Sequence, residues 1–121
     1  MAHLVHKSED GKLAVVAVLM DKGARHPLIQ AVFDNLPKAR QQDVSIPGIS
    51  IDLNALLPDN RAYYSFAGSL TTPPCSEGVS WFVLKTPTQV SADQIARFGH
   101  VYAANARPVQ PLNGRVVQAS Q

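Results

Sequence analysis

Cysteine is nearly absent from this chain of 121 residues, which contains only Cys75. A single thiol excludes an internal disulfide framework and any metal site built from four thiolates. The chain also lacks a run of about 18 apolar residues, so we expect no membrane-spanning helix and no membrane partner. It opens without a basic and then apolar leader, and as given we expect it to stay in the cytoplasm.

An excess of charge of one sign is also missing. The 11 basic and 9 acidic side chains leave a net charge of +2, and the basic residues are scattered along the chain. That balance predicts no basic surface for nucleic acid, so we expect no nucleic-acid partner. A hydrophobic content of 45% is too high for a disordered chain. The length fits one domain, 1–121, and not two.

Apolar segments separated by turn residues predict strands in the first part of the chain. The segment 3–7 is typical of a short strand, Asp10–Gly11 of a tight turn, and 12–20 of a strand covered on both faces. Together they predict a hairpin. The strand 3–7 has no upstream partner, so it is an edge that can template pairing with another chain.

Two short helices and further strands are expected after this hairpin. Helical spacing predicts a helix that begins at Pro27 and ends before Pro37, and a second helix capped by Ser91 that runs to about Ala104. Further strands are expected at 61–70, 78–85 and 115–117, with a loop-rich segment at 38–60. About five strands and two short helices indicate the α+β class with a largely antiparallel sheet.

Four histidines make a metal site worth considering. His3 and His6 are three positions apart, and on a strand such side chains point to opposite faces, so the two are not expected to chelate one ion together. Their spacing alone is that of ordinary strand histidines. His26, ahead of a proline at a helix start, and His100, late in a helix, are expected to be surface residues.

Thr71 and Thr72 stand before two prolines, which remove two backbone donors and end the preceding strand. From these residues alone the segment is a strand-ending turn, although a threonine hydroxyl can also donate and accept hydrogen bonds at a reactive site. Apolar side chains elsewhere in the chain are, from the sequence alone, plain core residues: Val5, Val15, Leu70, Val79 and Trp81.

Ordered sequence segments carry a family resemblance. They are HLVH at 3–6, DGKLAVVAVLM at 10–20, SLTTPPCSEGVSWFVLKTP at 69–87 and NARPVQPLNGR at 105–115. This order resembles the second half of the α-class carbonic anhydrases of bacterial type, the zinc enzymes that hydrate carbon dioxide. The resemblance implies the C-terminal half of that fold, carbon dioxide and bicarbonate as substrates, and Zn²⁺ as cofactor. It also implies that full-length relatives are usually periplasmic or secreted.

The resemblance assigns roles to particular residues. It implies that His3 is a zinc ligand, that His6 lies in the layer behind it, and that Thr71 is the gatekeeper hydroxyl. It places Thr72 on the substrate side, and it makes the apolar residues the wall that admits carbon dioxide: Val5, Val15, Leu70, Val79 and Trp81.

Further features follow from the same resemblance. It implies a cis bond between Pro73 and Pro74, and structural hydrogen bonds from Asn105 and Arg107 beneath the site. Many bacterial relatives bond the cysteine that corresponds to Cys75 to one near their N-terminus. That partner is missing here, so Cys75 is expected to be a free thiol or to bridge two chains.

The matching half lacks most of the family's zinc site. The other two zinc-binding histidines, an H-x-H pair, lie in the upstream half, and a glutamate that precedes the third ligand by two positions falls on Met1. Catalytic zinc needs three protein ligands and an open position. Three interpretations stay open: an enzyme completed by a second copy or a separate half, a non-catalytic remnant, and an interaction module on the same scaffold. We expect a homo-oligomer formed through the N-terminal edge strand.

Overall fold

The computed structural model describes residues 1–35, 52–102 and 105–120, which form two sheets, two α-helices and a short 3-10 helix. The strands are β1 (Ala2–Lys7), β2 (Leu13–Val18), β3 (Met20–Lys22), β4 (Tyr63–Ser69), β5 (Glu77–Leu84), β6 (Thr88–Val90) and β7 (Gln118–Ala119). The helices are α1 (Pro27–Asp34), α2 (Ala92–Val101) and the 3-10 helix η1 (Leu53–Leu56). These elements confirm the predicted α+β class.

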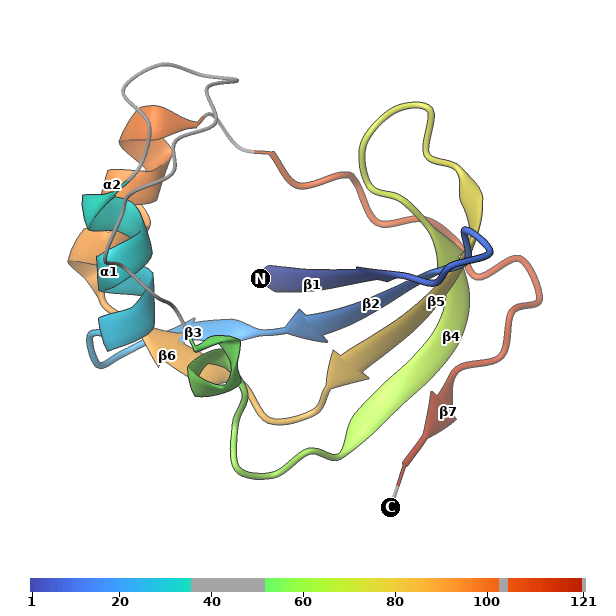
Figure 1. Cartoon of the computed structure of the whole chain (residues 1–121), viewed down its shortest axis with the longest axis horizontal. Helices are drawn as coiled ribbons and strands as arrows, with labels where there is room; N and C mark the ends of the chain where they lie inside the picture. Colours follow the sequence, from blue (N-terminus) through green and yellow to red (C-terminus); the bar gives the residue numbers. More distant parts are fainter. Residues whose placement is uncertain (36–51, 103–104, 121) are drawn as a thin grey trace.

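The main sheet has five strands in the order β1–β2–β5–β4–β7, and β3 pairs with β6 in a second sheet. The pairs β1–β2, β4–β5 and β4–β7 are antiparallel, which confirms a largely antiparallel sheet. The pairs β2–β5 and β3–β6 are parallel. In Figure 1 the two helices lie side by side beyond the small sheet, away from the main one.

The predicted hairpin is present, with Gly11 at a φ of +87°. The Gly11 N–H donates to the Ser8 carbonyl at 3.0 Å, and the Ser8 N–H donates to the Lys12 carbonyl at 2.8 Å. Glycine tolerates this left-handed conformation because it has no Cβ. The turn therefore fixes the register in which β1 pairs with β2.

The predicted strand 12–20 is too long and is divided in the structure. β2 ends at Val18, Leu19 is exposed, and the chain continues from Met20 as β3 of the second sheet. The apolar run continues across this change of sheet, so hydrophobicity alone does not mark the boundary. Val15, Ala17 and Val18 are buried, whereas other β2 residues are only half-buried, so the strand is not fully covered on both faces.

His26 corrects an expectation, since it is 8% exposed rather than a surface residue. The Gln94 side chain accepts from the His26 N–H at 3.0 Å and donates to the His26 carbonyl at 2.8 Å. His26 is also the N-cap of α1, and its Nδ1 accepts from the Ile29 N–H. The two bonds with Gln94 link the start of α1 to α2. His100 is exposed, as expected.

Ser91 caps α2 as predicted, in a capping box with Gln94. α1 ends at Asp34, before Pro37 as predicted, whereas α2 ends at Val101, short of the predicted Ala104. Most of the loop-rich segment 38–60 falls outside the described residues. Among the described residues, no helix reaches the length and hydrophobicity that a membrane crossing requires.

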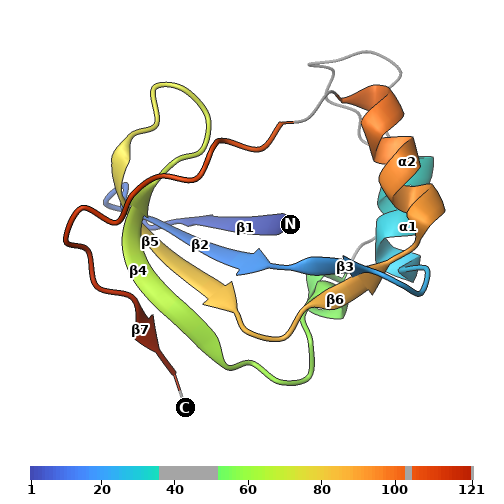
Figure 2. The same ribbon diagram turned by 180° about the vertical axis from the view of Figure 1, so that it is seen from behind.

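The tail after α2 returns to the main sheet, as the views from both sides show (Figures 1 and 2). The strand expected at 115–117 is wrong, because the tail pairs with β4 only at Gln118–Ala119. Arg115 belongs to a turn, in which its N–H and Nε donate to the Leu112 carbonyl. Its Nη1 also donates to the Ala67 carbonyl of β4 at 2.8 Å. These bonds prevail over the β-propensity of the two valines that follow.

Candidate functional site

Strand register brings several of the predicted site residues onto one face of the main sheet. Val5 pairs with Val15, and Val15 pairs with Trp81, so their side chains form a row across β1, β2 and β5. His3 pairs with Ala17 on the same face. Its imidazole meets the Trp81 indole edge to face, with 5.0 Å between ring centroids. Alternation along β1 places His6 on the opposite face, as predicted.

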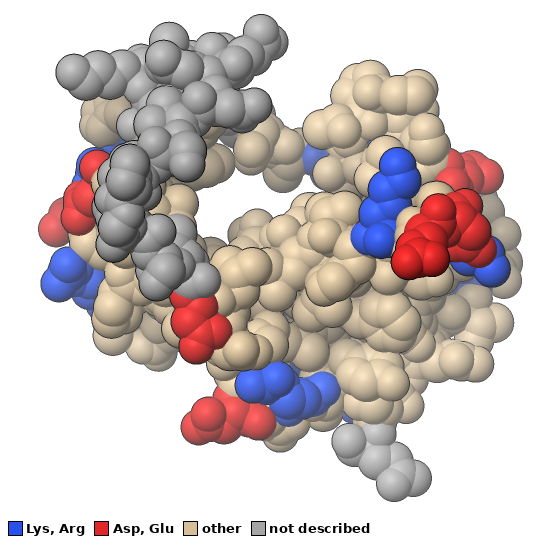
Figure 3. Space-filling view, viewed as in Figure 1, with Lys and Arg blue, Asp and Glu red and all other residues tan. Residues whose placement is uncertain are grey.

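The row is buried at one end and open at the other. Trp81 is 6% exposed and belongs, with Val15 and Val79, to a core cluster against which Leu70 packs. Val5, on the edge strand, is 60% exposed. The wall inferred from the family resemblance is therefore core at its centre and open to solvent at β1. In the view of Figure 3, the central part of the molecular surface shows few charged side chains.

His3 is exposed at the open end of this row. Partial burial lowers its pKa below the ordinary 6.5, and the nearby N-terminal ammonium lowers it further. Both effects favour the neutral imidazole, which is the form that binds a metal ion.

Trp81 lies close against β4 because Gly68 has no side chain. A Cβ placed on Gly68 would come within 2.7 Å of the Trp81 Cδ1 atom. On the same strand, Phe66 stacks on the indole with an interplanar angle of 1°. The indole Nε1 donates to the Ser69 carbonyl at 2.9 Å, which fixes the ring at the end of β4.

The segment after β4 forms a closed turn that carries both threonines. The Leu70 N–H donates to the Ser76 carbonyl at 2.9 Å, and the Cys75 N–H donates to the Thr72 carbonyl at 2.8 Å. The peptide bond between Pro73 and Pro74 is cis, as the resemblance implies. Thr71 and Thr72 are exposed on this turn.

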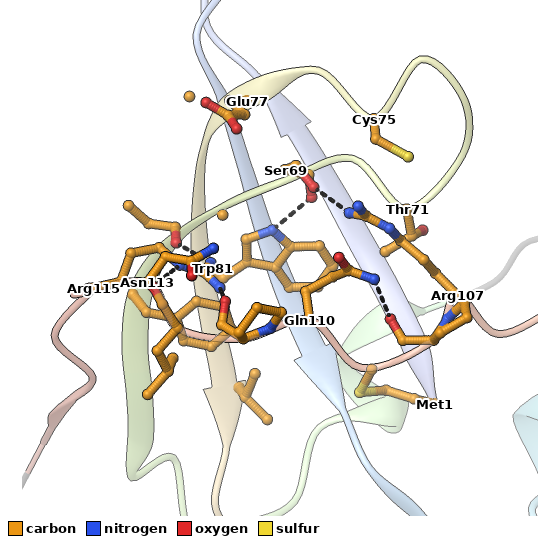
Figure 4. A pocket seen from close by; sticks show the side chains of 18 residues that line it. Met1, Ser69, Thr71, Cys75, Glu77, Trp81, Arg107, Gln110, Asn113 and Arg115 are labelled. Carbon is orange, nitrogen blue, oxygen red and sulfur yellow. Dashed lines mark hydrogen bonds between the residues drawn. The ribbon is translucent and has the colours of Figure 1, made fainter.

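Two cavities divide the predicted residues between them. The first, about 590 Å³, lies between β4, β5 and the tail, and its lining includes Thr71, Trp81, Cys75, Arg107 and Met1 (Figure 4). The second, about 450 Å³, lies between β1 and η1 at the sheet edge, and its lining includes His3 and Val5 together with His6 from the other face of β1. The remaining predicted residues line neither cavity: Val15, Leu70, Thr72 and Val79. His3 and Trp81 therefore lie on the same face of the sheet, whereas His3 and Thr71 line different cavities.

Sequence reasoning located Arg107 but missed its partner. Arg107 Nη1 donates to the Ser69 Oγ at 2.9 Å, in line with the structural hydrogen bonds expected of it. Ser69 and Gly68 were not singled out, although both stand directly before or within the SLTTPP segment. The sequence signal that could have identified them is a glycine followed by a serine at the end of the predicted strand 61–70.

This structure does not contain a full set of ligands for the zinc ion that the α-class carbonic anhydrases use. Among residues 1–35, 52–102 and 105–120, no group of three or more His, Cys, Asp or Glu side chains is placed to hold a metal ion. His3 contributes one nitrogen donor, which does not fix a catalytic geometry by itself. A complete zinc site is therefore absent from the described part of this chain.

The model of the eukaryotic-type carbonic anhydrase family matches residues 3–121. The chain belongs to this family. Carbonic anhydrases from Klebsiella pneumoniae and a Nostoc species are 50% and 46% identical to it, and each match covers 95% of this chain but 47% and 44% of the relative. The α-carbonic anhydrase of Thermovibrio ammonificans, solved with the inhibitor sulfanilamide, superposes with a TM-score of 0.89 at 43% identity, covering 95% of this chain and 51% of that one. The chain thus spans about half the length of the relatives it matches.

Proposed function

We propose that this chain takes part in the zinc-dependent, reversible hydration of carbon dioxide to bicarbonate, and that its residues form one half of a site whose remaining ligands lie outside these 121 residues. The observation that carries this proposal is the position of His3. It lies against Trp81, on the apolar face of the sheet, at the open edge of β1. A ligand from this chain therefore meets an apolar wall at the place where another chain has access.

Each predicted residue has a role in this half-site. His3 offers one metal-binding nitrogen, and the exposed Thr71 offers a hydroxyl that can donate and accept at the reacting oxygen. Carbon dioxide carries no net charge or dipole, so an apolar surface receives it without the cost of burying an unpaired polar group. The residues proposed for that surface are Val5, Val15, Leu70, Thr72, Val79 and Trp81.

The backbone of β1 supports pairing with a second strand. The bond from the Ser8 N–H to the Lys12 carbonyl sets the alternation, so the even-numbered residues of β1 exchange hydrogen bonds with β2. The N–H and carbonyl groups of His3, Val5 and Lys7 then point away from β2. Since β1 is the edge of the main sheet, the described residues provide no partner for these groups.

The same alternation places a partner's side chains beside His3. A strand that bonds to the backbone of His3 and Val5 presents its facing side chains on the Trp81 side of the sheet, with Cβ atoms about 4.5–5.5 Å apart. Further metal ligands from that strand could therefore reach an ion held by His3. In the chain alone the partner is a second copy, and two antiparallel β1 strands related by a two-fold axis bring two His3 side chains to one face.

Zinc content, measured together with carbon dioxide hydration, tests this function. The chain alone should bind zinc weakly, with about one ion for two chains, and His3→Ala should abolish both zinc binding and any hydration. His6→Ala is the matched control, because His6 faces the other side of β1, and it should mainly perturb packing. Retention of full zinc and full activity by His3→Ala would show that the ligand assignment is wrong.

The second candidate is a catalytically inactive remnant, or an interaction module on the same scaffold, that oligomerises. The lack of a three-ligand group among the described residues favours it. An oligomer that contains no zinc and shows no hydration, alone or with an added first half, would establish this alternative.

A further inference from the structure

An irregularity in the sheet frees the Ser69 backbone just before the threonines. The pairing of β4 with β5 shifts between Gly68 and Ser69, because Gly68 pairs with Val79 but Ser69 pairs with Glu77. The extra residue on β5 is Gly78, with a φ of +85°. Such bulges turn a strand end away from its ladder. Here the Ser69 carbonyl accepts the indole N–H of Trp81 at 2.9 Å.

A second chain of hydrogen bonds runs from the tail through Ser69 toward Thr71. Arg107 Nη1 donates to the Ser69 Oγ at 2.9 Å, and this hydroxyl donates to the Leu70 carbonyl, also at 2.9 Å. Figure 4 shows the Arg107 side chain reaching Ser69 beside Thr71. The Leu70 carbonyl belongs to the planar peptide group that carries the Thr71 N–H. Fixing that carbonyl therefore fixes the peptide plane from which Thr71 extends.

Thr71 depends on these neighbours for its position. Within the described residues it is exposed and makes no hydrogen bond of its own. Leu70 is anchored on one side by its N–H bond to the Ser76 carbonyl and on the other by the Ser69 hydroxyl. Arg107, which approaches from 38 positions further along the chain, supplies the charged end of this arrangement.

We propose that Arg107 is a positioning residue for Thr71, acting through the Ser69 hydroxyl and the Leu70 carbonyl. Its consequence for the reaction rests on the proposed hydration function, whereas its effect on the turn does not. Arg115 provides the matched control. It anchors the same tail to β4 through the Ala67 carbonyl at 2.8 Å, but its bonds do not reach Ser69.

Amide hydrogen exchange of the chain, followed by NMR, tests the positioning itself. Arg107→Gln should raise the exchange rates of the Leu70 and Cys75 amides, which close the turn, by about tenfold. The Ser8 amide in the distant hairpin should keep its rate. Arg107→Lys should restore part of the protection. In Arg115→Gln the two turn amides should change by less than about twofold. Equal effects of Arg107→Gln and Arg115→Gln, or no effect of either, would overturn the proposal.

Kinetics of whichever assembly hydrates carbon dioxide test the link to the reaction. Arg107→Gln should lower kcat by about tenfold with KM changed by less than about twofold, because the wall that receives the substrate is intact. Arg115→Gln should leave both parameters near their original values. An unchanged kcat in Arg107→Gln with a loosened turn would overturn the proposed link. Absence of hydration in every assembly would reject the proposed function instead, and the exchange rates would still decide whether Arg107 positions the turn.

Discussion

At the residue scale, the lack of a side chain at Gly68 determines where the Trp81 indole can lie. The indole of Trp81, the only tryptophan of the chain, occupies the space where a Cβ of residue 68 would lie. Trp81 in turn contacts His3 and bonds to Ser69. The position of the indole therefore connects the proposed ligand to the turn that carries Thr71.

Gly68→Ala should therefore destabilise the protein. The added Cβ would meet Trp81 Cδ1 at 2.7 Å, so the ring or the strand has to shift, at a cost of about 1–3 kcal/mol. Gly99→Ala is the control, because a Cβ built on this helical glycine meets no described atom within 4 Å beyond the neighbouring backbone of its own helix. It should stabilise by about 0.5–1 kcal/mol. Urea unfolding followed by tryptophan fluorescence measures both variants, and equal stabilities would contradict the account.

Cys75 offers a second test at the residue scale. Its thiol is half-buried at the first cavity, and no other cysteine exists in the chain. We expect it to react with a thiol reagent in the native protein, unless a disulfide between two chains protects it. Labelling and electrophoresis with and without reductant measure the two cases. No labelling together with unchanged mobility would contradict both.

At the element scale, the helix pair α1–α2 is joined by an ion pair whose pH dependence can be measured. Arg97 donates to the Asp34 carboxylate at 2.6 Å, and Gln30 donates to the same oxygen at 3.0 Å. These hydrogen bonds, with that from Arg97 the larger effect, lower the pKa of Asp34 below its ordinary 3.8.

A depressed pKa fixes the sign of the effect on stability. The contribution of Asp34 is fully present above pH 3.8 and is lost as the pH falls through its folded-state pKa. Because both side chains are exposed, the contribution is small. NMR titration should show the Asp34 pKa moving back toward its ordinary value in Arg97→Gln. An unchanged Asp34 titration in that variant would contradict the assignment.

The outward-facing backbone groups of β1 give a sharper test at the same scale. Val5→Pro removes an N–H that points away from β2, so the hairpin should persist while pairing with another chain is blocked. Leu4→Pro removes an N–H that bonds to β2 and should disrupt the hairpin itself. Sedimentation should show an oligomer for the original chain and a folded monomer near 13.1 kDa for Val5→Pro. A monomeric original chain would contradict pairing through β1.

The parts of the fold that were predictable are those set by local sequence. The β1–β2 hairpin follows from its Asp-Gly turn, and the start of α2 follows from the Ser91 cap. The parallel pairing of β2 with β5 was not predicted, because it joins strands far apart in sequence. The burial of His26 was missed for the same reason, since its partner Gln94 is 68 positions away.

The same distinction between local and long-range features separates what could and could not be predicted about the candidate site. Alternation along β1 correctly separated His3 from His6, because side-chain direction on a strand is a local property. The bulge between Gly68 and Ser69, and the bond from Arg107 to Ser69, depend on tertiary packing of β5 and the tail. The family resemblance singled out Thr71 and Arg107, and the structure adds the hydrogen bonds that connect Arg107 to the turn that carries Thr71.

At the scale of the whole molecule, the chain spans about half the length of its relatives and presents His3 at an open sheet edge, beside an apolar face. The backbone groups on the outer side of β1 and the face that holds His3 and Trp81 meet at this edge. A partner strand would therefore both cover the edge and bring its side chains to His3. The central claim is that one additional strand, which carries the remaining metal ligands, both covers this edge and completes the site.

The most direct test mixes this chain with a separately produced polypeptide that corresponds to the first half of the Klebsiella pneumoniae relative, and measures zinc content and carbon dioxide hydration of the mixture. The account predicts about one tightly bound zinc ion per complex and hydration well above that of either part, both lost with His3→Ala. It would be contradicted if mixing produced no gain in zinc or activity. One zinc ion per chain with full hydration by this chain alone, unaffected by His3→Ala, would contradict it equally.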